Sequence, residues 1–355
     1  MSRYYKIVVS DPSSGQIVRP ASLGGAISDA TYTSYVNGKT LPGAWNVELD
    51  IQEIDAATPM GFNSVRVWGV SVAEIAQAND LVGKNIKVFG GMQAGLPLAN
   101  PRQAGLLTSG VVYQAFGNWI GVDMTLDFVI MPCPATGGNT GGPGLLDQPR
   151  NFTLNWQNGQ QLSSQLKQCL QTAFPGYTVN VNVTSSLVAR SNESLVGAYT
   201  TLQQLAQAVR SASLAMVKTQ GYAGVSIVPR GTTIDVFDGT VPQSSQAAQI
   251  SFVDLIGQPT WIDSPNIQFK TAMRSDLKVG QQITLPPTVT TNSSISNSSL
   301  INQRLTFQGG FTIISLRSIG NYRQPTADAW VTVVEAAPNK VAAGGAGSAS
   351  AFAVF

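Results

Sequence analysis

Short stretches of alternating apolar and polar residues fill the first third of the chain. In residues 45–52, Trp45, Val47, Leu49 and Ile51 alternate with polar residues. A period of two is typical of a β-strand that buries one face. Similar stretches, each expected to be a strand, cover residues 4–10, 63–71 and 84–89.

Glycine and asparagine separate further strands in this part of the chain. Residues 110–116 and 119–130 are expected to form an antiparallel pair that turns at Gly117 and Asn118. Residues 72–79 are expected to be a short helix or helical turn. Closely spaced strands of this kind predict a small closed barrel or sandwich for residues 1–132.

The composition changes at residues 133–150, which are rich in glycine and proline and are expected to be a linker or long loop. Beyond them, apolar residues follow a helical spacing in residues 162–174 and 200–218, the second with Thr200 or Thr201 as its N-cap. Strands are expected at residues 152–156 and 177–183, and a hairpin between residues 223 and 237. Residues 151–240 therefore predict a small α+β domain.

The last part of the chain returns to strands and turns. Leu255, Gly257 and Pro259 are expected to open a strand, and residues 277–280 to make a tight turn before a strand at 281–285. A late hairpin spans residues 310–334 and closes on Trp330. We expect a second barrel at residues 241–337, with a mobile polar loop at 290–300 and a flexible tail at 338–355 that ends in apolar residues.

The expected fold is mainly β with an α+β insert, arranged as two small β-barrel domains flanking a central α+β domain. The two barrel sequences share little identity, but one short echo links them. Residues 81–84 (LVGK) precede the strand at 86–89, and residues 277–280 (LKVG) precede the strand at 283–285. Each is a polar turn directly before a short strand. Chance alone could give such a match.

The composition excludes several kinds of chemistry. The 355 residues include no histidine, so Ser-His-Asp and Cys-His nucleophiles are impossible and the commonest metal ligand is missing. Cys133 and Cys169 are too few for a zinc site or a disulfide scaffold and are expected to be buried thiols. No apolar stretch approaches the about 20 residues of a transmembrane helix, and the first residues do not form a signal peptide.

Charged residues make up only 11% of the chain, against about 25% in typical domains. Such a chain cannot keep a large free surface soluble by charge alone, so we expect partners or neutral polar residues to cover much of it. The net charge of +2 predicts no strong attraction for nucleic acid or anionic lipid.

The densest acidic cluster consists of Glu48, Asp50, Glu53 and Asp55. The first two carboxylates share one face of a strand about 7 Å apart. A glycosidase could use such a pair, although a solvated strand face explains it better. Residues 137–144 (GGNTGGPG) lack the Gly-Lys-Ser/Thr ending of a phosphate loop. We therefore expect no catalytic, cofactor-binding or metal-binding residues.

The last hairpin holds Arg317, Tyr322, Arg323 and Trp330, which belong to the residue types most enriched at binding hot spots. We favour a place in the barrel core for Trp330. The role of the two arginines stays open.

Several short motifs, in order along the chain, resemble the baseplate hub proteins of contractile-tail bacteriophages and the base of type VI secretion spike proteins. They include LVGKNIKVFGG at residues 81–91, Phe-Pro-Gly at 174–176, and the turn and hairpin of the last part. The positions that carry the resemblance are Gly83, Lys84, Gly90, Gly91, Trp156, Pro175, Gly176, Leu255, Gly257, Pro259, Leu277, Gly280 and Trp330.

The resemblance implies a structural virion protein and not an enzyme. It implies a homotrimer whose two barrels per subunit make a ring of six, joining the sixfold tail tube to the threefold central spike around the DNA-exit channel. The implied partners are the spike protein, a tail tube or distal tail protein and other baseplate proteins, with no cofactor and no membrane insertion. DNA would pass without specific binding, and the subunit would assemble in the host cytoplasm into the tail baseplate of the virion.

Two alternatives stay open. One is a tail-associated cell-wall hydrolase that uses carboxylates, since no histidine is present. The other is a receptor- or carbohydrate-binding β protein, although the six tryptophans are scattered along the chain.

Overall fold

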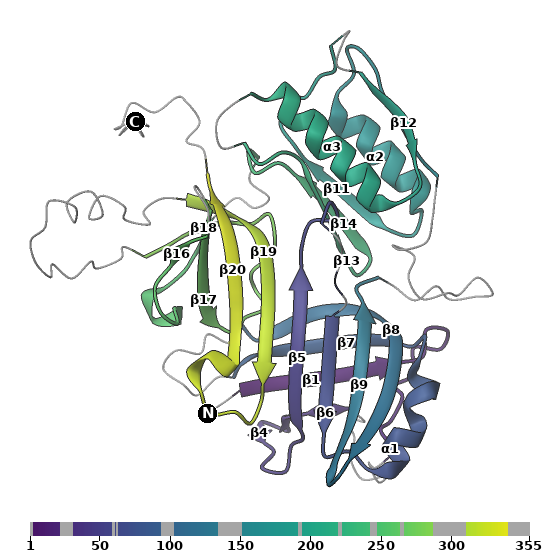
Figure 1. The fold of residues 1–355 in the computed structure, drawn as a ribbon, viewed down its shortest axis with the longest axis vertical. Coiled ribbons are helices and arrows are strands. Elements are labelled where there is room, and N and C mark those ends of the chain that lie inside the picture. Colours follow the sequence, from purple (N-terminus) through teal and green to yellow (C-terminus); the bar gives the residue numbers. More distant parts are fainter. Residues whose placement is uncertain are drawn as a thin grey trace, which may run out of the picture.

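Strands are the main secondary structure of the protein. The computed structural model describes residues 3–21, 31–58, 61, 63–93, 103–133, 151–190, 194–218, 222–241, 247–262, 266–286 and 310–339. The two long helices lie in the middle of the chain, between strands on both sides (Figure 1). The expectation of a mainly β fold with an α+β insert is confirmed.

One large sheet takes its strands from both ends of the chain. The N-terminal strands are β1 (Arg3–Ser10), β2 (Tyr32–Thr33), β5 (Asn46–Glu53), β6 (Asn63–Trp68), β7 (Asn85–Met92), β8 (Gly105–Ile120) and β9 (Asp123–Met131). The C-terminal strands are β15 (Ala248–Gln249), β16 (Thr260–Trp261), β17 (Ile267–Ala272), β18 (Gln282–Thr284), β19 (Gly310–Asn321) and β20 (Trp330–Pro338). They pair in the order β16-β17-β20-β19-β5-β6-β9-β8-β7-β1-β2, with β18 on β19 and β15 on β18.

The strand pairs described do not close the two barrels that the sequence predicts. Instead, β5 pairs with β19 along six residues of each strand and fuses both ends of the chain into one 13-stranded sheet. Both strands would otherwise leave a row of backbone donors and acceptors without partners, which mutual pairing satisfies. Figure 1 shows β5 and β19 side by side, with β1 crossing the N-terminal strands in a second layer.

The N-terminal strands β5–β9 and the C-terminal strands β16–β20 have the same topology. In the first set, called the N-terminal module, β5 pairs with β6, β6 with β9, β9 with β8 and β8 with β7. In the second set, the C-terminal module, β16 pairs with β17, β17 with β20, β20 with β19 and β19 with β18. All of these pairs are antiparallel, and each strand of one module matches the strand at the same place in the other.

The same glycine turn precedes the third strand of each module. Gly83 and Gly280 have φ angles of +79° and +86°, a conformation that glycine adopts without strain. The amide of Gly83 donates to the carbonyl of Val112 at 2.8 Å, and that of Gly280 donates to the carbonyl of Ile313 at 2.7 Å. The amides of Val112 and Ile313 donate back to the residue after each glycine, at 2.9 and 3.0 Å. The short echo between residues 81–84 and 277–280 therefore marks equivalent turns.

A β-bulge also occupies the same place in both modules. The register of β8 against β9 shifts between Val112 and Gln114, and that of β19 against β20 shifts between Ile313 and Ser315. A bulge bends its strand and increases the local twist. Each long hairpin therefore bends directly beyond the glycine turn.

The two modules differ in the connection to their third strand. The N-terminal module inserts α1 (Val72–Gln77) and the 3₁₀ helix η1 (Ala78–Leu81), close to the helical turn expected at residues 72–79. A capping box begins α1, because Ser71 accepts from the amide of Glu74 and the Glu74 carboxylate accepts from the amide of Ser71. The C-terminal module makes the same connection with the short turn at residues 277–280 alone.

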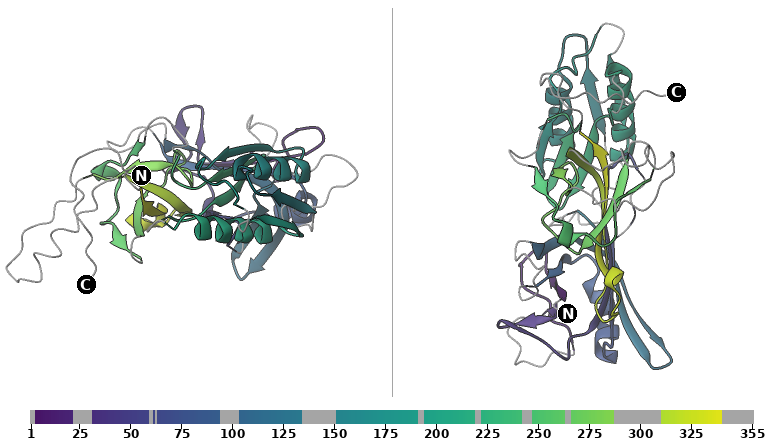
Figure 2. Two further views of the ribbon diagram at one scale, coloured as in Figure 1. Left: turned by 90° about the horizontal axis from the view of Figure 1, so that it is seen from above. Right: turned by 90° about the vertical axis from the view of Figure 1, so that its left-hand side faces the viewer.

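The turn of the β8–β9 hairpin lies beyond its expected position. The strands continue past Gly117 and Asn118 and turn at Gly121 and Val122, where Gly121 has a φ of +62°. Gly117 stays within β8 because α1 packs over it: a Cβ atom there would lie 2.6 Å from Cγ2 of Ile75. The hairpin projects from its module (Figure 2).

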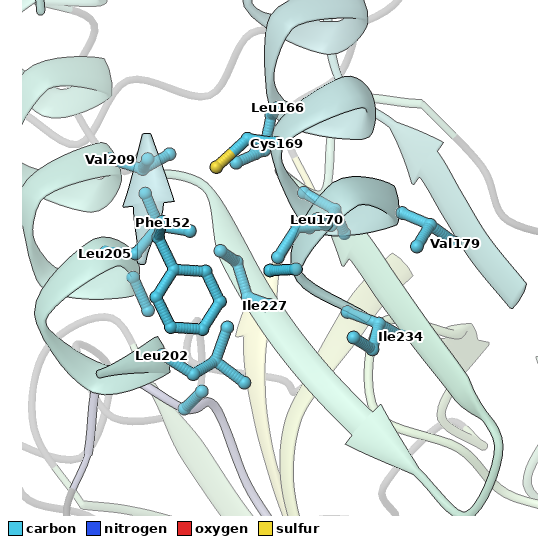
Figure 3. Packing of buried hydrophobic residues seen from close by; sticks show 14 of the residues in the cluster. Phe152, Leu166, Cys169, Leu170, Val179, Leu202, Leu205, Val209, Ile227 and Ile234 are labelled. Carbon is cyan, nitrogen blue, oxygen red and sulfur yellow. The ribbon is translucent and has the colours of Figure 1, made fainter. Parts of the chain in front are cut away.

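The middle of the chain forms the α+β part. Its elements are β10 (Phe152–Trp156), α2 (Leu162–Ala173), β11 (Thr178–Asn182), β12 (Leu195–Tyr199), α3 (Leu202–Met216), β13 (Ser226–Arg230) and β14 (Thr233–Phe237). Both helices agree with the predicted spacing, and Thr201 is the N-cap of α3. The side chains of Phe152, Cys169, Leu205 and Ile227 point toward one another between the helices and the strands (Figure 3).

Two local predictions in the last third need correction or fall outside the described residues. The strand expected to open at Leu255 begins only at Thr260: residues 252–254 form the 3₁₀ helix η3 (Phe252–Asp254), and Gly257 turns the chain with a φ of +81°. Leu255 itself makes an isolated bridge to Thr271. The glycine-rich segment at 137–144, the polar loop at 290–300 and the tail from residue 340 lie outside the described residues.

Candidate assembly surface

Two carboxylates of the acidic cluster, Glu48 and Asp50 on β5, pair with side chains of the C-terminal module. Asp50 accepts two hydrogen bonds from the guanidinium group of Arg317, at 2.8 and 2.6 Å. Glu48 accepts a hydrogen bond from Asn321 at 2.9 Å. The bond to Asp50 raises the pKa of Arg317 above its usual value. This strand face is partly exposed, and β19 also supplies partners for both carboxylates.

The other two carboxylates of the cluster reach the α+β part of the chain. Glu53 accepts from Nε of Arg230 at 2.7 Å and from the backbone amide of Val279 at 2.8 Å. Asp55 is buried and accepts from the backbone amide of Ile227 at 3.1 Å. The acidic cluster thus binds all three parts of the chain at their junction, a role that the sequence did not reveal.

Trp330 closes the junction from the C-terminal side: it is buried, as expected, but in the core of the N-terminal module and not in the core of its own module. It is 2% exposed, and its indole Nε1 donates to the carbonyl of Gly91 in β7 at 2.9 Å. Its ring also meets Tyr322 edge to face, and Tyr322 meets Tyr5 of β1 in the same way. The aromatic side chain therefore packs in the core of the N-terminal module.

Arg3, which the sequence did not single out, holds the end of the last hairpin. Its guanidinium group donates to the carbonyls of Asn321, Tyr322 and Thr326, at 2.7, 3.2 and 2.8 Å, and also to that of Gln324. Burial lowers the pKa of Arg3 from its usual value. One side chain from the first strand thus fixes the loop between β19 and β20.

The second open arginine, Arg323, also crosses between the modules. Its guanidinium group donates to the carbonyl of Ala44 at 2.5 Å, and its backbone amide donates to the side chain of Asn46 at 3.0 Å. Both arginines of the last hairpin therefore serve the contact within the chain.

A polar cleft of about 1030 Å³ lies where the three parts meet. Arg230 in its wall binds Glu53 and Asp235, and Arg274 binds Asp254 and Asp276. Of these four ion pairs, the one between Arg230 and Glu53 joins different parts of the chain, and all four engage the arginines structurally. Among the described residues, no group of three or more His, Cys, Asp or Glu side chains could hold a metal ion.

The positions that carry the family resemblance lie at turns and in cores. Trp156 is fully buried and donates to the carbonyl of Gln160 at 2.8 Å, and Leu277 is 4% exposed. Lys84 follows the first glycine turn and binds Asp11 at 2.6 Å, which lowers the pKa of that carboxyl.

Glycine and proline occupy further resemblance positions, at turns and at close contacts of the backbone. Gly91 has a φ of +142°, and a Cβ atom there would lie 2.6 Å from Cα of Ala104. A Cβ atom on Gly90 would lie 2.6 Å from Cδ1 of Leu107. Pro175 and Gly176 form the turn after α2, and Pro259 precedes β16. The structure does not bring the resemblance positions together into one site.

The two cysteines lie in one hydrophobic cluster, in the α+β part and at its border. Cys133 is fully buried and Cys169 is 5% exposed. Burial raises the pKa of the Cys169 thiol to about 11, so it is protonated at neutral pH. No helix in the described residues is long and apolar enough to cross a membrane.

Comparison with known proteins gives likenesses in structure alone. No protein-family model and no curated protein sequence matches the chain. It is similar to the tail protein from Neisseria meningitidis MC58, with 11% identity, 96% of this chain and 97% of that chain covered and a TM-score of 0.46. The 43 kDa tail protein of prophage MuSo2 from Shewanella oneidensis shares 9% identity over 94% of this chain and 98% of that chain, with a TM-score of 0.45.

A third likeness is to a Francisella PdpA-VgrG complex. The identity is 6% and the TM-score is 0.41, and the match covers 95% of this chain but only 58% of that chain. Likenesses at these levels carry no argument about function, which has to come from contacts within the chain. The chain is thus similar, over 94–96% of its length, to two tail proteins and to a PdpA-VgrG complex.

Proposed function

We propose that this protein is a structural subunit of a baseplate hub in a contractile phage tail. The observation that carries the proposal is the repeated module: one chain holds two modules of the same topology, joined edge to edge by β5 and β19. Three copies of such a chain present six similar modules, so a threefold assembly can meet a sixfold partner.

In this proposal the subunit is a homotrimer in the tail baseplate of the virion, assembled in the host cytoplasm. One side of the ring binds the tail tube or a distal tail protein, and the other binds the central spike protein and other baseplate proteins. The ring surrounds the DNA-exit channel. The net charge of +2 suits this role, because a weakly charged wall does not hold DNA by counterion release. The proposal includes no catalytic role, since the acidic cluster is engaged at the junction.

The mass of the purified protein tests the proposal. We expect a trimer by mass photometry or light scattering, and a six-lobed ring in negatively stained images. A monomer that persists at high concentration, with the spike partner also present, would contradict the proposal.

A further inference from the structure

One edge of the N-terminal module has no strand beside it. Strand β8 pairs with β7 only from Gly105 to Val111, and its end pairs with β9 on one side. On its other side, no strand of the described part of the chain pairs with residues 115–120. Three apolar side chains stand out here: Phe116, Trp119 and Ile120 are 43%, 65% and 75% exposed.

A second open edge lies at the far end of the sheet. Strand β16 pairs with β17 on one side, and none of the strands described lies on the other. Ile262, directly after β16 at this edge, is 51% exposed. In Figure 1, β16 and β8 lie at opposite sides of the molecule. Exposed apolar edges are templates for pairing, and proteins usually cover them.

The topology shows that these two edges match each other. Strand β16 of the C-terminal module is the equivalent of β5, and β8 of the N-terminal module is the equivalent of β19. Within the chain, β5 and β19 already pair antiparallel and join one module to the next. If this pairing is repeated between two copies of the chain, β16 of one copy lies beside β8 of the next copy.

The matching bulges fix the register on the β8 side. Val112 and Ile313 begin equivalent bulges. Because Asn118 and Ile319 each lie six residues further (112 + 6 and 313 + 6), these two residues are equivalent.

Counting across the neighbouring strands fixes the register on the β16 side. Directly after the bulges, Val129 of β9 and Glu335 of β20 are equivalent. Val129 pairs with Ser64 and Glu335 pairs with Gln268, so Ser64 and Gln268 are equivalent. Ser64 pairs with Asp50, and Gln268 pairs with Thr260, so Asp50 and Thr260 are equivalent. Within the chain, Asp50 pairs with Ile319.

We propose that β16 of one copy adds to the open edge of β8 of the next copy, antiparallel, with Thr260 opposite Asn118. This inference rests on the proposed trimer and names the surface that closes it. The register also places Ile262 opposite Phe116, where the pair within the chain is Gln52 with Arg317. A polar pair inside the chain thus becomes an apolar pair between chains, which suits a contact that must form between separate molecules. Three such head-to-tail contacts close a ring with each edge used once.

Engineered disulfides test the register. Thr260→Cys and Asn118→Cys are made in separate chains, and mild oxidation of the mixture is expected to give a disulfide-linked dimer, because directly opposed Cα atoms lie about 4.5–5.5 Å apart. Neither variant alone is expected to link. The matched control is Asp50→Cys with Ile319→Cys in one chain, which should form the equivalent bond within the chain.

Two results would overturn the strand pairing. One is linking of Asn118→Cys to itself, which indicates a twofold contact of hairpin with hairpin. The other is a failure of the expected register when the wild type is a trimer and the control bond within the chain forms. In that case the mixture of Thr260→Cys and Asn118→Cys stays unlinked, or Thr260→Cys links equally well to Trp119→Cys.

A second measurement uses charge in place of sulfur. Phe116→Lys and Ile262→Glu are each expected to be monomeric, and a chain carrying both changes is expected to regain the trimer. Val196→Lys, at an apolar position that is 60% exposed on β12, is the control and should stay trimeric. If the wild type is a trimer and the single variants are trimers too, the strand pairing fails while the proposed function stands. If the wild type is a monomer, the proposed function fails as well.

Discussion

The long hairpins of the two modules share their pairing and their bulge but end differently. The loop of the β19–β20 hairpin, residues 322–329, is bound by Arg3, and its own Arg323 donates to the carbonyl of Ala44. The ring of Trp330 meets Tyr322 of this loop. The β8–β9 hairpin ends in a two-residue turn whose Val122 is 93% exposed. One hairpin has a neighbouring module in the same chain, and the other has none. The comparison teaches that equivalent strands are buried where another module packs beside them, and form an exposed edge where no described module does.

Loss of the buried tryptophan is expected to give the largest effect and sharpens the comparison. Trp330→Ala removes a buried side chain and its hydrogen bond to Gly91, and should lower the free energy of unfolding by about 3–5 kcal/mol. The matched change Trp119→Ala, at the 65% exposed tip, should change it by less than about 0.5 kcal/mol in the isolated subunit. Urea unfolding measures both, and similar losses would remove the distinction between the two hairpins.

The junction within the chain should depend on Glu53 more than on Asp50. Glu53→Ala removes the acceptor of the Val279 amide and one acceptor of Arg230, which keeps its bond to Asp235. This change is expected to cost about 2–3 kcal/mol. Asp50→Asn affects the pair with Arg317, whose side chains are 36% and 47% exposed, and should cost at most about 1 kcal/mol. Thermal or urea unfolding compares the two variants, and an equal cost would show that the junction is not centred on Glu53.

The equivalence of the two glycine turns can be broken by one matched pair of variants. Gly83→Ala and Gly280→Ala each force a side chain into a positive φ, at an expected cost of about 1–2 kcal/mol. Gly43→Ala, where no heavy atom lies within 4 Å of the new Cβ and φ is not positive, is the control and should be nearly neutral. Clearly unequal costs for the first two variants would count against equivalent turns.

The smallest expected effect depends on pH and distinguishes the two glycine turns by the charge of the residue that follows each glycine. Lys84 binds Asp11, whereas Gln281 at the equivalent position of the C-terminal module is uncharged. The hydrogen bond from Lys84 holds the pKa of Asp11 below its usual value of about 3.9. A lowered carboxyl pKa adds stability above pH of about 4 that is lost as the pH falls.

We therefore expect Asp11→Asn to destabilise the protein slightly at neutral pH, and progressively less as the pH falls below about 4. Lys84→Met should reproduce this pH dependence, and Gln281→Met should leave it unchanged. Urea midpoints measured across the acid range check the result, and a pH-independent effect of Asp11→Asn would show that the ion pair is not its cause.

Much of the fold follows from local patterns in the sequence. The spacing of Leu166, Leu170 and Leu205 places both long helices, because a helix buries one apolar face. Alternation predicts β5, β6 and β10 for the same kind of reason. The predicted position of the β8–β9 turn was wrong. Glycine is a common turn residue, but Gly117 is needed within the strand because α1 leaves room only for a small residue there.

The junction could not be predicted, because its partners are remote in the sequence. The pair of Asp50 with Arg317 spans 267 residues, and that of Glu53 with Val279 spans 226. Without pairing information, four carboxylates on one strand look like a solvated face. The merged sheet was missed for the same reason: the pairing of β5 with β19 leaves no local pattern. Only the two glycine turns gave a local sign of the repeated module.

The hydrogen bonds of Arg3 have a consequence for synthesis on the ribosome. The carbonyls that it caps lie 318 to 323 residues later in the chain. At usual rates of translation, on the order of 15–60 s pass between the emergence of the arginine and that of its acceptors. The arginine of the opening strand therefore stays hydrated, without these acceptors, until the β19–β20 hairpin has emerged. Completion of the first-made module thus depends on the emergence of the β19–β20 hairpin from the exit tunnel.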